Sequence, residues 1–347
     1  MNIWKIHQLL QNLVILLSFI PRKIVHVFLV FVIAVPITIA GYTIPASVAV
    51  SKDSSTYRTF TEWYLNKETL GPGTRDIVNE MLRITATSDC KQASLKLSEI
   101  RSFGLLLSDS KNVDITPVKF MTNLVMLALG DQISDISPLK FLTKLEYVSL
   151  HGNLISDLSP LKSSTNLSEL YLSNNKISDL GPLKSLTNLY ELDLHYNQIS
   201  DLSPLMSLKN LGILSLENNK IVSINPLKSL TNLVKLYLSN NQISDISPIE
   251  NLTKLVRLEL DNNQISDISP LRYLTNLFPE LRLHNNQISD ISPLAFLTQL
   301  EVVSLHNNQI FDISPLRYLT NLNGVLLMNN PIANKSCPLK PESICRF

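Results

Sequence analysis

Residues 233–254 read LVKLYLSNNQISDISPIENLTK, and this stretch decides the fold. The same 22-residue pattern, L-x-x-L-x-L-x-x-N-x-I-S-D-I-S-P-L-x-x-L-T-x, recurs between Leu124 and Leu322. Full units begin at Leu124, Leu145, Leu167, Leu189, Leu211, Leu233, Leu255, Leu277 and Leu300, and a truncated one begins at Leu322. Self-similarity at such a period is the signature of a solenoid, in which no unit can bury its own apolar face. Positions within a unit are numbered below from its first leucine.

Each unit predicts one short strand followed by a non-helical return. Positions 3 to 7 alternate between exposed and apolar residues, as in Tyr147-Val148-Ser149-Leu150-His151, which is the pattern of a half-buried strand. Isoleucine or leucine at positions 11, 14 and 17 points inward again. Proline at position 16 fixes φ and lacks an amide hydrogen, so it favours a short extended or turn-like segment over a long helix. Each buried leucine or isoleucine contributes roughly 1.5–3 kcal/mol, and we expect one continuous core.

Nine units carry an asparagine at position 9. Its amide group both donates and accepts hydrogen bonds, so we expect it to satisfy the backbone of the tight turn between neighbouring coils. The predicted asparagine ladder consists of Asn153, Asn175, Asn197, Asn219, Asn241, Asn263, Asn286, Asn308 and Asn330.

The template resembles the leucine-rich repeat family, and its I-S-D-[IL]-S-P-L version is most similar to the repeats of bacterial internalins. The resemblance implies an α/β-type solenoid shaped as a right-handed horseshoe or arc. It also implies a parallel sheet on the concave face, turns with short 3-10 or extended segments on the convex face, and ligands that are usually proteins.

One unit is longer than the template. The spacing from Leu277 to Leu300 is 23 residues, because Phe278-Pro279 stands before Glu280. We expect a bulge there, with Pro279 removing a hydrogen-bond donor from the sheet.

The first 49 residues differ from the rest of the chain. An apolar run begins at Ile24, follows Pro21-Arg22-Lys23 and precedes Ser47-Val48-Ala49, which is the order of a secretory signal peptide. The alternative is an uncleaved membrane anchor through residues 24–40. Both predict that the repeats leave the cytoplasm and are secreted, periplasmic or displayed on the cell surface.

The segments beside the repeats predict caps for the two ends of the core. Residues 50–101 read as a linker and a small helical cap, in which Trp63, Leu65 and Ile77 belong to an apolar stripe and Thr74 is a candidate N-cap. Residues 102–123 read as a degenerate first repeat, 124–321 as nine repeats, and 322–347 as a terminal repeat and C-terminal cap. In an oxidising compartment we expect a disulfide between Cys337 and Cys345.

The sequence offers no chemistry that predicts catalysis. It contains no P-loop, dinucleotide fingerprint, H-E-x-x-H or G-x-S-x-G motif, so we expect no enzyme and no cofactor. A net charge of +1 without a basic stripe argues against a nucleic-acid partner. His284 and His306 occupy position 7 of neighbouring units, and a metal pair is conceivable. We favour ordinary exposed histidines and no metal, because no carboxylate is expected in line beside them.

The variable residues at positions 3 and 5 form the surface that a partner would contact. Tyrosines there can bury a large area at low entropic cost, and an acidic block before a basic step at Lys235 and Arg257 favours a partner with complementary charge order. The predicted partner-binding residues are Tyr147, Glu169, Tyr171, Glu191, Asp193, Lys235, Tyr237, Arg257, Glu259 and Arg282.

Together these features predict a monomeric, non-enzymatic interaction module that binds a protein or peptide on its concave face, outside the cytoplasm. The alternative is a structural cell-envelope protein that binds cell-wall glycan or associates with itself.

Overall fold

The computed structural model describes residues 56–107 and 113–347. Within them the strands form one parallel sheet of 12 strands, in sequence order. The strands are β1 (Ser102–Leu106), β2 (Met126–Gly130), β3 (Tyr147–Ser149), β4 (Glu169–Tyr171), β5 (Glu191–Asp193), β6 (Ile213–Ser215), β7 (Lys235–Tyr237), β8 (Arg257–Glu259), β9 (Glu280–Arg282), β10 (Val302–Ser304), β11 (Gly324–Leu326) and β12 (Cys345–Arg346). From β3 to β11 each strand occupies positions 3 to 5 of its unit, shifted by the one extra residue in the unit that begins at Leu277, so the predicted repeat solenoid is confirmed.

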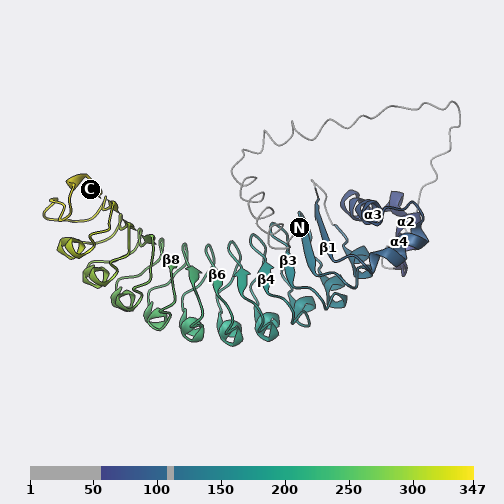
Figure 1. Cartoon of the computed structure of the whole chain (residues 1–347), viewed down its shortest axis with the longest axis horizontal. Coiled ribbons are helices and arrows are strands. Elements are labelled where there is room, and N and C mark those ends of the chain that lie inside the picture. Colours follow the sequence, from purple (N-terminus) through teal and green to yellow (C-terminus); the bar gives the residue numbers. More distant parts are fainter. Residues whose placement is uncertain (1–55, 108–112) are drawn as a thin grey trace, which may run out of the picture. The chain divides into compact units, whose positions relative to one another are not determined.

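Ten short 3-10 helices of the described repeats line the outer side of the curve, opposite the strands on its inner side (Figure 1). They are η4 (Thr116–Phe120), η5 (Ser137–Phe141), η6 (Ser159–Leu161), η7 (Gly181–Ser185), η8 (Ser203–Ser207), η9 (Asn225–Ser229), η10 (Ser247–Ile249), η11 (Ser269–Tyr273), η12 (Ser292–Phe296) and η13 (Ser314–Tyr318). Each has proline in its first turn, where the missing amide hydrogen costs nothing.

The aspartate at position 13 prepares the turn into most of the 3-10 helices, with Ser223 in its place before η9. Asp157 is typical: its Oδ1 accepts a hydrogen bond from the Ser159 amide at 2.8 Å, and its Oδ2 accepts one from the Ser159 hydroxyl at 2.8 Å. The carboxylates of Asp201 and Asp312 make the same pair of bonds. These aspartates therefore stabilise local turns.

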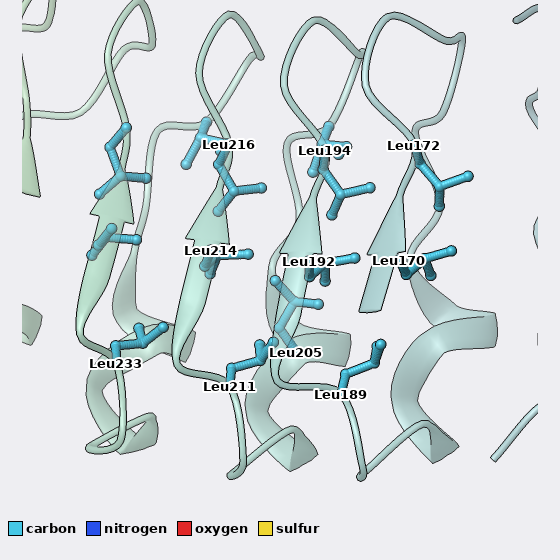
Figure 2. Packing of buried hydrophobic residues seen from close by; sticks show 14 of the residues in the cluster. Leu170, Leu172, Leu189, Leu192, Leu194, Leu205, Leu211, Leu214, Leu216 and Leu233 are labelled. Atoms are coloured by element: carbon cyan, nitrogen blue, oxygen red, sulfur yellow. The ribbon is translucent and has the colours of Figure 1, made fainter. Parts of the chain in front are cut away.

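The core consists of leucine rows that continue from coil to coil. Figure 2 shows Leu170, Leu192 and Leu214 at position 4 of successive units, each pointing inward from its strand. All three are fully buried, as are the leucines at positions 1 and 6 of the same units. Because each leucine packs against its equivalents in the coils on either side, no coil has a core of its own.

The nine ladder asparagines link each coil to the one before it. The Asn197 Nδ2 donates to the carbonyl oxygens of Leu194, in its own coil, and of Leu172, in the preceding coil, both at 3.0 Å. Its Oδ1 accepts from the Ile177 amide of the preceding coil at 3.0 Å. The same three bonds occur at Asn153, Asn175, Asn219, Asn241, Asn263, Asn286, Asn308 and Asn330.

The extra residue of the long unit forms the expected interruption of the sheet. Phe278 donates to the carbonyl oxygen of Val256, whereas Pro279 accepts from the amides of Glu301 and Val302. Phe278 as donor and Pro279 as acceptor thus make the backbone hydrogen bonds that a single residue at position 2 makes in other units. The register between β8 and β9 begins only at Leu258, opposite Leu281.

The helical cap covers the first coil but differs in two details from the sequence-based expectation. It comprises α2 (Phe60–Leu65), η3 (Lys67–Thr69), α3 (Pro72–Thr85) and α4 (Cys90–Leu97). The prediction that Leu65 belongs to the buried stripe was wrong, because it is 70% exposed at the end of α2. Thr74 is not the N-cap of α3, which is Gly71. The Thr74 hydroxyl instead accepts a hydrogen bond from the Asp114 amide at 2.9 Å and so ties the cap to the first repeat.

At the other end, β12 extends the sheet after the short helix η14 (Glu342–Ile344). A disulfide joins Cys337 to Cys345 in this segment. The predicted signal peptide or anchor lies outside the described residues. In the part of the chain that is described, no helix has the length and apolar character needed to cross a membrane.

The ladder predicts a large loss of stability when one of its asparagines is truncated. For Asn219→Ala we expect a drop of about 2–4 kcal/mol in the free energy of unfolding, because a buried amide and two carbonyl groups lose their partner. The matched control is Asn210→Ala, where an exposed side chain loses one bond to Thr187 and the drop should stay below about 1 kcal/mol. Urea denaturation followed by circular dichroism measures both, and equal losses would refute a special role for position 9.

Candidate protein-binding surface

The ten predicted partner-binding residues lie side by side on the inner face of β3 to β9. The parallel register places Tyr147 beside Glu169 and Glu169 beside Glu191, while Tyr171 lies beside Asp193. Further along, Lys235 is adjacent to Arg257 in the neighbouring strand. Equivalent positions of successive repeats therefore form continuous rows across the sheet, and the predicted residues share one surface.

Tyrosines and carboxylates concentrate over β3 to β6. We call Glu169, Glu191, Asp193 and Glu217 the acidic cluster. The Tyr171 hydroxyl donates to Glu169 Oε2 at 2.9 Å, and the rings of Tyr147 and Tyr171 lie 5.4 Å apart. The cluster is thus bordered by two aromatic rings that contact each other.

Burial and mutual repulsion disfavour the charged forms within the acidic cluster. Burial raises the pKa of Glu191, and the neighbouring charge of Glu169 raises it further. Burial also raises the pKa of Glu217, with repulsion from Asp193 as a smaller cause. Glu217 Oε2 is buried and accepts no hydrogen bond from the described part of the chain. Such a desolvated carboxylate is unfavourable for the isolated fold.

His195 provides partial compensation within the same region. Its Nδ1 lies 2.6 Å from Asp193 Oδ1. Burial alone would lower the pKa of His195, but the bond to Asp193 and the charges of Asp193 and Glu217 outweigh it, so the pKa is raised. His195 and Glu217 were not among the ten predicted residues. Glu217 does belong to the acidic block that the sequence shows before Lys235, whereas His195 could have been indicated only by comparing position 7 with positions 3 and 5.

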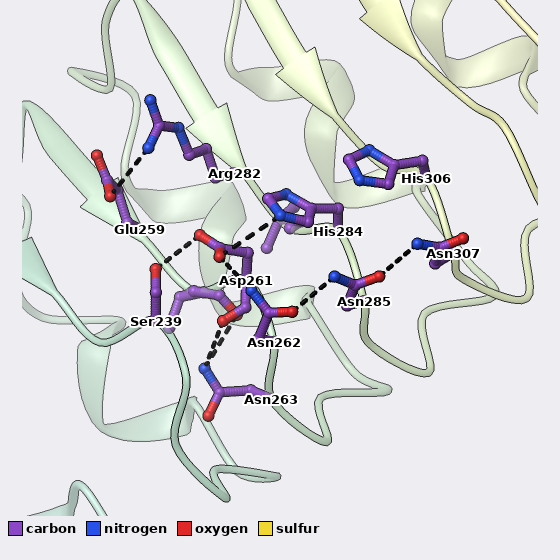
Figure 3. A network of polar contacts seen from close by, with 12 residues as sticks. Ser239, Glu259, Asp261, Asn262, Asn263, Arg282, His284, Asn285, His306 and Asn307 are labelled. Carbon is purple, nitrogen blue, oxygen red and sulfur yellow. Dashed lines mark hydrogen bonds and ion pairs between the residues drawn. The ribbon is translucent and has the colours of Figure 1, made fainter. Parts of the chain in front are cut away.

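The cations farther along the face are mostly paired. Arg257 contacts Glu259 at 3.0 Å and Glu280 at 3.7 Å. Arg282 contacts Glu280 at 2.9 Å and Glu259 at 3.4 Å, the latter visible in Figure 3. These two arginines and two glutamates form a closed network with no net charge. The basic step expected from the sequence is therefore reduced to Lys235, which is exposed and forms no salt bridge within residues 56–107 and 113–347.

The two neighbouring histidines stack, and a carboxylate does lie in line with them. The rings of His284 and His306 are 4.3 Å apart and 14° from parallel. Asp261 Oδ2 lies 3.5 Å from His284 Nε2, while its Oδ1 accepts from the Ser239 hydroxyl at 2.6 Å (Figure 3). The expectation that no carboxylate would stand there was wrong, because Asp261 occupies position 7 of the adjoining repeat.

This histidine pair is not arranged as a metal site. Face-to-face rings direct their nitrogens side by side and not toward one point, and among the described residues no three His, Cys, Asp or Glu side chains are grouped to hold an ion. Burial, followed by the charge of His284, lowers the pKa of His306.

Position 8 carries a backbone requirement that residue type alone did not predict. Most units have asparagine there in the left-handed conformation, with φ between 54° and 58°. Tyr196 adopts the same conformation, with φ of 53°, although a tyrosine rarely does so. It is 56% exposed and packs edge-on against His195. Backbone strain of this kind tends to occur at functional sites, and here it lies in the repeat that carries Glu191 and Asp193.

The repeats match a known family model. The model for leucine-rich repeats in two copies matches residues 122–163, 165–205, 191–229, 231–273 and 280–318. No curated protein is significantly similar to the chain.

Solved structures of bacterial internalins are similar to this one. Internalin InlF from Listeria monocytogenes is 35% identical over 77% of this chain and 80% of its own, with a TM-score of 0.70. Internalin C2 of the same organism is 34% identical over 59% of this chain and 91% of its own, with a TM-score of 0.52. A plant peptide hormone receptor, RGFR1 in complex with RGF2, shares the fold with 23% identity over 69% of this chain and 41% of its own, and a TM-score of 0.57.

The strained tyrosine predicts a stabilising substitution. Tyr196→Asn should raise the free energy of unfolding by about 1 kcal/mol, because asparagine tolerates the left-handed conformation better. The reverse change in the equivalent position of the next repeat, Asn218→Tyr, should lower it by a similar amount. Chemical denaturation of both variants checks the pair, and a destabilised Tyr196→Asn would contradict the argument.

The raised pKa of Glu191 predicts a stability that depends on pH. Since the pKa is higher in the folded protein than in the unfolded chain, the folded state is penalised once the pH rises above the folded pKa. Glu191→Gln should therefore raise the melting midpoint at pH 7, with the gain shrinking as the pH falls toward about 4. Glu250→Gln, on the exposed outer side, serves as the control. Calorimetry across this pH range would contradict the account if the gain were constant or absent.

Proposed function

This chain belongs to the leucine-rich repeat family, with repeats of the internalin type, and we propose that it is an exported, monomeric, non-enzymatic module that binds a protein or peptide on the inner face of its sheet. The single observation that carries the proposal is the acidic cluster. Its carboxylates are held on a rigid sheet with raised pKa values at Glu191 and Glu217, and a buried Glu217 oxygen accepts no hydrogen bond from the described residues. A partner that supplied hydrogen bonds or charge there would relieve this penalty.

The composition of the face supports a macromolecular partner. Tyr147, Tyr171 and Tyr237 present ring surface between charged groups, which is the mixture found at protein interfaces. A backbone fixed by the sheet on one side and the leucine core on the other loses little freedom on binding. The plant receptor of the same fold, solved in complex with RGF2, illustrates peptide binding by a leucine-rich repeat solenoid.

One serine–histidine pair of the inner face resembles a catalytic arrangement, but its burial favours a binding role. Ser173 Oγ lies 3.0 Å from His151 Nδ1, which is a geometry that nucleophilic enzymes use. Ser173 is only 2% exposed, however, and the described hydrogen bonds of His151 include no carboxylate that would orient its ring. A substrate could not reach the hydroxyl without rearrangement of the sheet.

Export is supported by two features. The disulfide between Cys337 and Cys345 is typical of oxidising compartments. The N-terminal order of basic, apolar and small residues is that of a secretory signal. In the alternative form of this proposal, residues 24–40 are not cleaved and anchor the exported chain in the membrane. N-terminal sequencing of the protein isolated from its cells distinguishes cleavage from retention.

A second candidate function, attachment to cell-envelope glycan or self-association, is favoured by a row of aromatic residues on the outer side. Tyr273, Phe296 and Tyr318 end the consecutive helices η11, η12 and η13, and each is more than half exposed. The Arg272 guanidinium lies 5.9 Å from the Phe296 ring, and that of Arg317 lies 4.9 Å from the Tyr318 ring. Exposed aromatic surfaces of this kind bind ligands or other copies of a chain.

A capture experiment with matched tyrosine pairs separates the two candidates. Cross-linked capture from the native cells should recover about ten-fold less partner with Tyr171→Ala/Tyr237→Ala than with the unaltered chain, because the loss of two interface tyrosines removes more than 1 kcal/mol of binding energy. The control pair, Tyr273→Ala/Tyr318→Ala, should recover the normal amount. The reverse result would favour the outer row and the envelope role, and it would contradict binding on the inner face.

A further inference from the structure

An apolar row runs along one edge of the inner face and was not apparent from positions 3 and 5. It occupies position 2 of five consecutive repeats, which we call the edge strip: Tyr190, Gly212, Val234, Val256 and Phe278. Tyr190 is 51% exposed, Val256 38% and Phe278 43%. The repeats on either side carry Ser168 and Glu301 at this position, so the strip has defined ends.

The backbone of the edge strip is continuous, although Gly212 is buried and contributes no side chain. Ladder hydrogen bonds of 2.8–2.9 Å connect the backbone of each member to the next, from Tyr190 through Gly212 to Phe278. The Tyr190 ring covers Gly212, where an added Cβ would lie only 2.3 Å from Tyr190 Cε2. Because the backbone pairing persists, the side chains are spaced at the separation of adjacent strands, about 4.8 Å.

The electrostatic surroundings differ at the two ends of the strip. Tyr190 directly precedes Glu191, so the acidic cluster adjoins the beginning of the strip. Val256 and Phe278 adjoin the closed network of Arg257, Glu259, Glu280 and Arg282, which is neutral. A partner thus meets apolar surface along the strip and, at one end only, negative charge that His195 compensates in part.

We propose that the edge strip and the acidic cluster together bind an amphipathic helix of another protein, with its apolar side on the strip and lysine or arginine side chains near one end against the cluster. This rests on the proposed function and specifies the chemistry of the partner. Burial of the strip supplies apolar contact, and the cation supplies the charge that the cluster lacks.

The spacing of the strip selects a helix over an extended chain. A helix presents one side chain per turn along a face, every 5.4 Å or so, whereas a strand presents one about every 6.7 Å. The five rows are about 4.8 Å apart. Over their four intervals, the accumulated mismatch between partner side chains and rows is about 2.4 Å for a helix and about 7.6 Å for a strand. Five rows span about 19 Å, which corresponds to about 13 helical residues.

The position of the cation follows from which groups are already paired. Arg257 and Arg282 are engaged by two glutamates, and Lys235 is an exposed ammonium whose charge acts on Glu191 of the acidic cluster without forming a salt bridge in the described chain. Glu217 Oε2 is buried without a hydrogen-bond partner in the described chain. A guanidinium or ammonium group of the partner would form charge-assisted hydrogen bonds there.

Selection from a displayed library of random 16-residue peptides tests the proposal with the full chain as bait. Enriched peptides should carry apolar residues at spacings of three and four, with lysine or arginine toward one end. Their affinity, measured by titration with the synthesised peptides, should fall about ten-fold for Val256→Asn and for Glu191→Gln/Glu217→Gln. The matched control Val222→Asn, at an exposed valine away from the sheet, should change it less than about two-fold. Circular dichroism confirms that each variant is folded.

The outcomes separate this inference from the proposed function. Peptides with alternating apolar residues, acidic peptides, or no enrichment at all would overturn the helix proposal. If binding survives Val256→Asn but is lost with Tyr171→Ala/Tyr237→Ala, the inner face binds a partner of another kind and only the further inference fails. If selected peptides bind equally to all of these variants, both proposals fail.

Discussion

The structure depends on the fact that a single 22-residue coil cannot bury its own leucines. Each coil therefore needs the coils beside it, and the position-9 asparagine makes this dependence specific by bonding one carbonyl group and one amide of the preceding coil, as well as a carbonyl group of its own coil. The leucine rows supply most of the apolar burial, whereas the asparagines fix the register. Because every inward position is committed to this packing, variation is confined to the outward residues of each strand and to the edges.

Much of this architecture could be predicted from the sequence, because a repeated pattern reports the average environment of each position. The strands, the short 3-10 helices and the turn role of the aspartates all follow from residue type and period. Features that depend on one unit were harder to predict. Thr74 looks like an N-cap but bonds to Asp114 in the first repeat. Tyr196 adopts the left-handed backbone conformation of the asparagines at the equivalent position of other repeats, and this became apparent only from the structure.

The candidate binding surface likewise combines features that the sequence predicts with features that it does not. The register makes neighbours of positions 22 residues apart, so the contiguity of Tyr171, Glu191 and Asp193 could be anticipated. Which charges neutralise each other could not, since Arg257 bonds to Glu259 on its own strand and also reaches Glu280 on the next. The consequence is functional: the apparent basic step is mostly compensated, and the unbalanced charge lies at the acidic cluster. In that region the unfavourable features accumulate, namely raised carboxyl pKa values and a strained tyrosine backbone, and we propose that a partner offsets them there.

The most direct test of binding on the inner face is oxidative footprinting of the tyrosines with and without the captured partner. The account predicts that Tyr171, Tyr190 and Tyr237 become protected in the complex, while Tyr273 and Tyr318 on the outer side react as in the free protein. Protection of the outer tyrosines with unchanged reactivity of the inner ones would contradict it.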